Sequence, residues 1–135
     1  MATHFSGPVV SDSGFEGALT GNVTGNLTGA VQETVIAYSA NGAISIAPQV
    51  AVITKGTAAA MTIAAPTATT HDGIIIEIVS TTAAAHTVTA TTIGFNAADA
   101  GGDVGTFGGA IGDGLRIVAY QGEWYVLNNI NVTIA

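Results

Sequence analysis

The stretch at residues 115–127 reads LRIVAYQGEWYVL and decides the fold class. Two runs rich in β-branched and aromatic residues, 115–120 and 123–127, flank the dipeptide Gln121-Gly122. Short runs of this composition, separated by two turn residues, are typical of paired β-strands. The stretch therefore predicts two strands joined by a tight turn.

Similar runs continue through the chain from residue 33 onward. Each is rich in Val, Ile, Thr or Ala and ends near Gly, Pro or Asn, and none shows a convincing helical period with caps. The pattern predicts an all-β body, a compact antiparallel β-sandwich or barrel. The expected strands cover residues 34–38, 43–47, 50–54, 60–64, 74–79, 86–91, 115–120, 123–127 and 131–134.

Three local features refine this prediction. The dipeptide Asn41-Gly42 predicts a hairpin between the first two strands. The run Ile74–Val79 predicts a central strand, because it is apolar almost throughout. The glycine-rich stretch 94–114 predicts a long loop with brief extended pieces.

The charge balance is unusual for a chain of 135 residues, a length that fits one domain. Two cations and nine carboxylates make 8% charged residues, against roughly 25% in an average protein. Hydrophobic residues reach 48%, which excludes a disordered chain. A surface this poor in charge is covered by neutral polar side chains or buried against other chains, so the composition indicates an assembly protein.

The net charge of −7 also excludes several partners. Nucleic acid requires a basic face, and so does an anionic membrane surface. No apolar run approaches the roughly 20 residues of a membrane span, and the first residues do not resemble a secretion signal. We expect neither nucleic acid nor a membrane as a partner.

Residues 17–32 repeat with a period of four, as in GNVTGNLTG. An extended chain places the glycines and one set of apolar residues on the same face, whereas a helix would lose about 1 kcal/mol at each Gly. That face cannot be buried by the segment alone, so we expect it to contact copies of itself or another surface. The sequence predicts an extended arm at 1–32 and a body at 33–135, with a flexible linker as the alternative for the arm. The apolar residues of the repeat are Leu19, Val23, Leu27 and Val31.

The leader at residues 1–16 is irregular and carries few apolar residues. It is either a frayed terminus or a docking segment whose Phe5 inserts into a partner. The docking segment would comprise Thr3, His4, Phe5, Ser6, Gly7, Pro8, Val9 and Val10.

Candidate catalytic residues are sparse. The three histidines, His4, His71 and His86, lie far apart in sequence. His71-Asp72 precedes a glycine and predicts a turn, and His86 begins an expected strand. No nucleophile motif surrounds the available hydroxyls. The sequence predicts no catalytic residue, and we expect a protein that is not an enzyme.

The sequence gives equally little support for a metal site or a sugar-binding site. Asn96, Asp99 and Asp103 offer oxygen ligands for calcium in the glycine-rich loop, but their spacing matches no EF-hand. Trp124 and Tyr125 offer a sugar platform, but strand alternation sends them to opposite faces, and a core Trp is favoured. The chain has no Cys, and we expect no cofactor and no metal.

Several motifs, in this order, resemble a domain found in virion proteins of tailed bacteriophages. The leader THFSGPV at residues 3–9 also resembles that of phage head decoration and head-fibre proteins. The body motifs are TKGTAAA at 54–60, AAPT at 64–67, Asp72-Gly73, VSTTAAAHTVT at 79–89, TFGGAIGDG at 106–114 and VAYQGEWYV at 118–126.

This resemblance implies a capsid decoration (cement) protein on the outer surface of the head shell. Its implied partners are the major capsid protein and two further copies of the chain, as a homotrimer. The leader and the arm would then bridge neighbouring capsid subunits and stabilise the expanded shell. The alternatives are a head-fibre or tail-fibre adhesin that binds a host glycan and, more remotely, a glycan hydrolase, which requires a pair of carboxylates in a cleft.

Overall fold

The structure is a computed structural model, and it describes residues 32–97 and 103–135. The predicted docking segment, the four apolar residues of the repeat and Asp99 lie outside the described residues. Of the predicted arm, only Gln32 is described.

The described body is built from β-strands, and its residues form no helix. No helix in this part of the chain is therefore long and apolar enough to cross a membrane. The ten strands are β1 (Val35–Tyr38), β2 (Gly42–Ile44), β3 (Gln49–Ile53), β4 (Ala60–Ile63), β5 (Ile75–Ser80), β6 (Thr87–Ala90), β7 (Val104–Phe107), β8 (Gly114–Tyr120), β9 (Glu123–Ile130) and β10 (Val132–Ile134).

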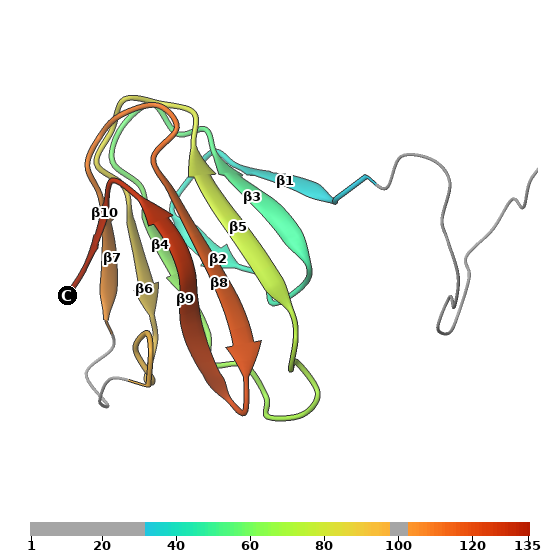
Figure 1. Cartoon of the computed structure of the whole chain (residues 1–135). Helices are drawn as coiled ribbons and strands as arrows, with labels where there is room; N and C mark the ends of the chain where they lie inside the picture. Colours follow the sequence, from blue (N-terminus) through green and yellow to red (C-terminus); the bar gives the residue numbers. More distant parts are fainter. Residues whose placement is uncertain (1–31, 98–102) are drawn as a thin grey trace, which may run out of the picture. The chain divides into compact units, whose positions relative to one another are not determined.

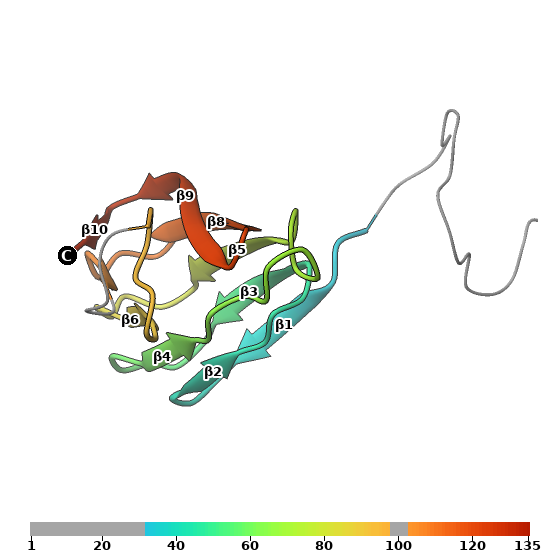
Figure 2. The same ribbon diagram turned by 90° about the horizontal axis from the view of Figure 1, so that it is seen from below.

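The strands form two five-stranded sheets that face each other (Figure 1, Figure 2). Sheet A has the order β1-β3-β5-β8-β9, and sheet B has the order β10-β7-β6-β4-β2. The predicted all-β sandwich is therefore confirmed. The expected central strand is also confirmed, because β5 lies in the middle of sheet A.

The N-terminal half of each sheet is parallel. The chain crosses to the other sheet after each of β1 to β5, so strands two apart in the sequence run in the same direction and become neighbours. The parallel pairs are β1–β3, β3–β5, β2–β4 and β4–β6. This finding corrects the expectation of purely antiparallel pairing, which holds only for the four pairs that involve β7 to β10.

The same crossing corrects the hairpin expected at Asn41-Gly42. Strands β1 and β2 lie in different sheets, so the dipeptide turns the chain between layers. The side chain of Asn41 accepts hydrogen bonds from Lys55 Nζ at 2.8 Å and from the backbone N–H of Ala60 at 3.2 Å. Asn41 therefore connects the crossing between β1 and β2 to the crossing between β3 and β4.

The C-terminal half is antiparallel and connects the two sheets at one side of the sandwich, where β9 and β10 are the edge strands. Strands β8 and β9 pair around Gln121 and Gly122, both with positive φ, as the two-residue turn predicts. A single residue, Asn131 (φ 52°), then separates β9 from β10, which belongs to the opposite sheet. The stretch 94–114, expected to be a long loop with brief extended pieces, contains the short strand β7 and the fully buried Phe95.

The core lies between the two sheets. Alternate residues of each strand point inward, as the period of two requires. Trp124, the only tryptophan, has no exposed surface, and its indole N–H donates to the carbonyl of Ala64 at 2.8 Å. The largest core side chains include Ile53, Met61, Ile63, Ile76, Ile78, Val88, Phe95, Phe107, Leu115, Ile117 and Trp124.

Candidate functional site

The outer face of sheet A is unusually apolar. On a sheet exposed to water, the outward residues are normally polar. Here they are mostly aliphatic, and we name this surface the aliphatic face. It consists of Val35 and Ala37 from β1, Val50 and Val52 from β3, Ile75, Glu77 and Val79 from β5, Gly114, Arg116 and Val118 from β8, and Asn128 and Ile130 from β9. Three further outward residues of sheet A, Tyr120, Glu123 and Tyr125, lie beyond it at the turn between β8 and β9.

The outer face of sheet B has a different chemistry. Five of its outward residues are threonines, whose hydroxyls suit contact with water. No charged residue stands among the outward residues of the five strands of sheet B. We name it the threonine face. It consists of Ala43, Ala60, Thr62, Thr87, Thr89, Val104, Thr106 and Thr133. The two layers of one sandwich are therefore unequal, and only the aliphatic face exposes branched hydrocarbon over all its strands.

Strand register arranges the aliphatic face in two rows that cross all five strands. Neighbouring outward side chains in such rows lie close enough to contact one another. The first row carries the charges, and the second row is apolar throughout. The first row is Val35, Val50, Glu77, Arg116 and Asn128, and the second is Ala37, Val52, Val79, Gly114 and Ile130.

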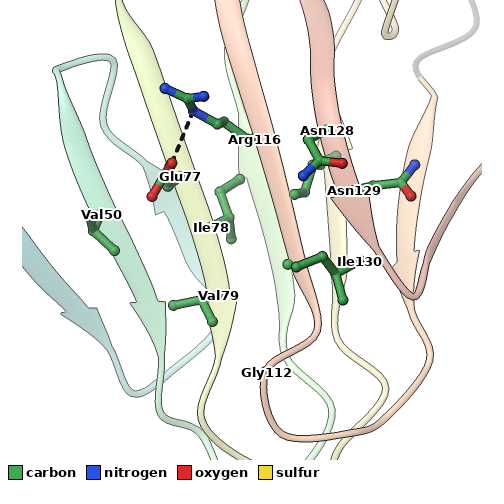
Figure 3. Close-up of a pocket in the computed structure, with 11 residues that line it drawn as sticks. Val50, Glu77, Ile78, Val79, Gly112, Arg116, Asn128, Asn129 and Ile130 are labelled. Atoms are coloured by element: carbon green, nitrogen blue, oxygen red, sulfur yellow. Dashed lines mark ion pairs between the residues drawn. The ribbon is translucent and has the colours of Figure 1, made fainter.

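One ion pair lies near the middle of this face. Arg116 Nε contacts Glu77 Oε1 at 2.9 Å, and both side chains are about half exposed, at 47% and 51%. Figure 3 shows the pair between β5 and β8, with Asn128 on the neighbouring strand. An exposed pair of this kind contributes at most about 1 kcal/mol to stability. Its effect is to cancel the two charges within the rows.

Two shallow hollows flank the ion pair, each about 300 Å³ in volume. The first lies where the second row reaches Gly114, because glycine has no side chain there, and Val79 and Ile130 border it (Figure 3). The second lies on the side of Ile75 and Pro48. Neither hollow is lined by a histidine, and only Glu77, Arg116 and Glu33 bring charge to them. Their linings suit apolar side chains of another protein better than a polar reaction.

The candidate histidines have local partners. His71 Nδ1 accepts a hydrogen bond from the backbone N–H of Thr67 at 2.8 Å, within the predicted turn. His86 is fully buried and lies against the edge of Phe107, with the ring centres 6.3 Å apart. Neither ring lines one of the two hollows, and no hydrogen bond joins the two histidines within the described residues.

Buried His86 is held as a neutral imidazole. Its Nδ1 accepts a hydrogen bond from the backbone N–H of Ala59 at 3.0 Å, so the proton resides on Nε2. Nε2 lies 3.0 Å from the hydroxyl of Thr82, which itself donates to the carbonyl of Lys55 at 2.8 Å. Burial is the main cause that lowers the pKa of His86 below 6.5, and the charge of Lys55 lowers it further, against a smaller opposing effect of Asp113.

The candidate calcium ligands are also engaged. Asn96 Oδ1 accepts from the backbone N–H of Val126 at 2.8 Å, and Asp103 Oδ2 accepts from the backbone N–H of Phe95 at 2.9 Å. These bonds fasten the loop after β6 to β9 and around the buried Phe95. In the described residues, no group of three or more His, Asp or Glu side chains is arranged to hold a metal ion.

The aromatic residues near the turn after β8 separate as alternation predicts. Trp124 points into the core and Tyr125 points outward, opposite Val118. Tyr120, which is 57% exposed, lies beside Tyr125 with ring centres 6.5 Å apart and a tilt of 54°. The sequence interpretation had not singled out Tyr120 as a site residue. Exposed Tyr120 and half-buried Tyr125 form a small aromatic pair at one end of the aliphatic face.

Comparison with protein-family models, with curated protein sequences and with solved structures finds no significant match to this chain.

Proposed function

We propose that this chain is a capsid decoration protein of a tailed bacteriophage, which binds the outer surface of the head shell. The sequence motifs that resemble phage virion proteins support this proposal. The observation that carries it in the structure is the aliphatic face, a broad, mostly apolar surface suited to the protein–protein contacts of an assembly. The role is binding and mechanical support, without a cofactor.

The proposed partners are the major capsid protein and further copies of the chain in a homotrimer. The docking segment from Thr3 to Val10 would contact the shell, and the repeat residues of the arm would extend that contact or pair between copies. A protein that binds only the assembled shell stabilises it by mass action, because release must precede opening of the shell. Bridging of neighbouring capsid subunits would strengthen the expanded head in this way.

The chemistry of the threonine face agrees with an outer position on the particle. Threonine hydroxyls remain hydrated without charge, so this face would stay in contact with solvent while the rest of the chain is bound. The face also gives a chain with only two cations a hydrated surface that does not depend on ionic groups.

A second candidate function is a head-fibre or tail-fibre adhesin for a host glycan. The pair of exposed Tyr120 and half-buried Tyr125 favours it, because aromatic rings stack on the apolar faces of sugars. The pair is small, and Trp124, the best stacking residue in the chain, is buried. The decoration role is therefore the first proposal.

Labelling of intact virions separates the two functions. An antibody or gold label directed at the threonine face should decorate the heads of particles if the chain is a decoration protein. Label confined to fibres or tails would overturn this function in favour of the adhesin. A matched glycan-binding assay with Tyr120→Ala should show no change if the tyrosines do not bind sugar.

Removal of the docking segment tests the mechanism. Variant Phe5→Ala and a variant lacking residues 1–31 should lose attachment to expanded empty heads, whereas Thr62→Lys on the threonine face should attach normally. The melting transition of each variant controls for folding. Normal attachment of the shortened chain would overturn docking through this segment.

A further inference from the structure

The aliphatic face leaves branched hydrocarbon exposed across a whole sheet. Val35 is 65% exposed, Ile130 is 59% exposed and Ile75 is 36% exposed. Exposed apolar side chains that stand singly are ordinary, but a contiguous patch of them marks an interaction site. The threonine face of the same sandwich is mostly polar, so the apolar character is confined to one of the two outer faces. The aliphatic face therefore requires a protein cover.

From these features we propose that the cover is a second copy of this chain, and that copies associate through the aliphatic face. Self-association is part of the proposed function, so this assignment rests on it and adds the surface by which it occurs. Three properties of the face favour a copy over a foreign protein: its neutrality, the unused hydrogen-bonding groups of the ion pair, and its shape.

Neutrality is the first property. Two copies of a chain with net charge −7 repel each other over most of their surfaces. Within its two rows the aliphatic face carries one carboxylate, Glu77, and one guanidinium, Arg116, whose charges cancel, and the carboxylates of Glu33 and Glu123 lie at its margins. The only other cation of the chain, Lys55, is held by Asn41 and the carbonyl of Ala58. Among the described strands, the aliphatic face therefore combines low charge repulsion with a large apolar gain.

The ion pair supplies the second property. Arg116 uses Nε toward Glu77 Oε1, and within the described residues its terminal amino groups and Glu77 Oε2 have no hydrogen-bond partner. Each copy thus offers both a donor and an acceptor at the centre of the face. In a closed ring of two or three copies, every Arg116 can bind the Glu77 of a neighbour. A surface that presents both a hydrogen-bond donor and a matching acceptor can bind a second copy of itself.

The shape of the face is the third property. Ile130 projects at the edge of the second row, directly beside the hollow over Gly114, with which it is in register. A projection and a hollow of matching chemistry therefore stand next to each other on one surface. The Ile130 side chain of one copy fits the hollow of the next, where it would contact Val79 and displace water. Packing of this kind restores close contact at an otherwise exposed patch.

The test measures the mass of the full-length chain by sedimentation equilibrium over a range of concentrations. The intact chain should give a multiple of 13.3 kDa, three times that value for the proposed trimer. Variants Val52→Lys and Ile130→Lys should weaken association at least tenfold. Thr62→Lys, which adds the same charge at an outward position of a parallel strand in sheet B, should leave association unchanged.

Charge reversal distinguishes a copy from a foreign partner. Glu77→Arg alone should weaken association, because each copy then presents two guanidinium groups to the other. The double variant Glu77→Arg with Arg116→Glu restores both signs in every copy and should restore association. A foreign partner of fixed charge would not be rescued by this exchange, so recovery supports a second copy and absence of recovery overturns it.

The outcomes separate this assignment from the proposed function. A monomeric intact chain, or an oligomer unchanged by Val52→Lys, overturns association through the aliphatic face. If the intact chain has the mass of a dimer and Val52→Lys has the mass of a monomer, the result supports association through the aliphatic face and overturns the proposed trimer. Attachment to phage heads is measured separately with these variants and with Phe5→Ala. If Phe5→Ala no longer binds the shell but keeps the mass of the intact oligomer, shell binding and self-association use different surfaces.

Discussion

The side-chain amide of Asn131 donates a hydrogen bond of 2.9 Å to the carboxylate of Asp113. This bond connects the corner between β9 and β10 to the loop before β8. The other carboxylate oxygen accepts the backbone N–H of Ala110 at 2.8 Å. Hydrogen bonds from Ala110 and then Asn131 are the main causes that lower the pKa of Asp113 below 3.8. The carboxylate of Asp113 therefore stabilises the corner between β9 and β10 fully above pH 3.8. This contribution to the stability of the fold is lost as the pH falls through the lower native pKa.

Substitution Gly108→Ala should destabilise the body by about 2 kcal/mol. A Cβ at Gly108 would overlap the side-chain amide of Asn131. The amide is held by Asp113, so it can move away only by breaking that bond. Urea unfolding at neutral pH measures the difference. The matched control is Gly56→Ala, because a Cβ there has no neighbour within 4 Å and Gly56 has no positive φ. Equal stability of the two variants would contradict the proposed role of the corner.

Stability should fall as the pH drops below 6.5, because His86 is neutral in the folded body. The unfolded chain takes up a proton near pH 6.5, and the folded chain does so only at its lower native pKa, so acid favours unfolding between these values. Each pH unit in this window costs up to about 1.4 kcal/mol for a single proton. Thermal unfolding of the intact chain between pH 7.5 and about 5 measures the loss.

Two histidine variants control the pH experiment. His86→Gln removes the titrating ring and should flatten the dependence on pH above 5, although it lowers stability throughout. His71→Gln keeps the buried ring and should retain the dependence of the intact chain. An unchanged acid sensitivity in His86→Gln would show that another group is responsible.

Trp124 should report folding directly. Its ring is fully buried between the sheets, so its fluorescence should be blue-shifted in the native protein and move to the red on unfolding. Trp124→Phe should cost about 1–2 kcal/mol, since it leaves a small cavity and removes the hydrogen bond to the carbonyl of Ala64. Tyr125→Phe, a change on the outward side of the same strand, is the control and should be nearly neutral. Native emission typical of an indole in water would contradict the buried position.

Local sequence predicted the strands well, but it did not predict their partners. The pair of strands around Gln121-Gly122 follows from two adjacent runs and a turn, all within one stretch of chain. The crossing at Asn41-Gly42 has an equally good local hairpin signal, yet its strands enter different sheets. Alternation of side chains shows which residues point inward, but not to which of two sheets a strand belongs. Parallel pairing depends on that choice and so could not be derived.

The aliphatic face could not be assembled from sequence because its residues come from five strands. A signal was nevertheless present in the run Val50–Ile53, which is apolar on both faces, and in Ile74–Val79, where Glu77 is the only polar residue. In a sandwich of two sheets, only one face of a strand reaches the core. A strand with two apolar faces therefore indicates a second contact surface. The pairing of Glu77 with Arg116 needed the register between β5 and β8, which only the structure gives.

Attachment to phage heads should depend only weakly on salt. The chain has two cations: one lies in the neutral pair of the aliphatic face, and the other is held by neighbouring backbone and amide groups. The proposed apolar contacts of Phe5 and the arm would not be screened by salt, whereas exposed ionic contacts are screened beyond a Debye length, which is about 3 Å at 1 M salt. Co-sedimentation of the chain with expanded heads at 0.05, 0.15 and about 1 M NaCl should therefore recover similar amounts of bound protein, while a variant lacking residues 1–31 should bind at none of these concentrations. Release of the intact chain at the middle concentration would identify an electrostatic interface and refute apolar docking.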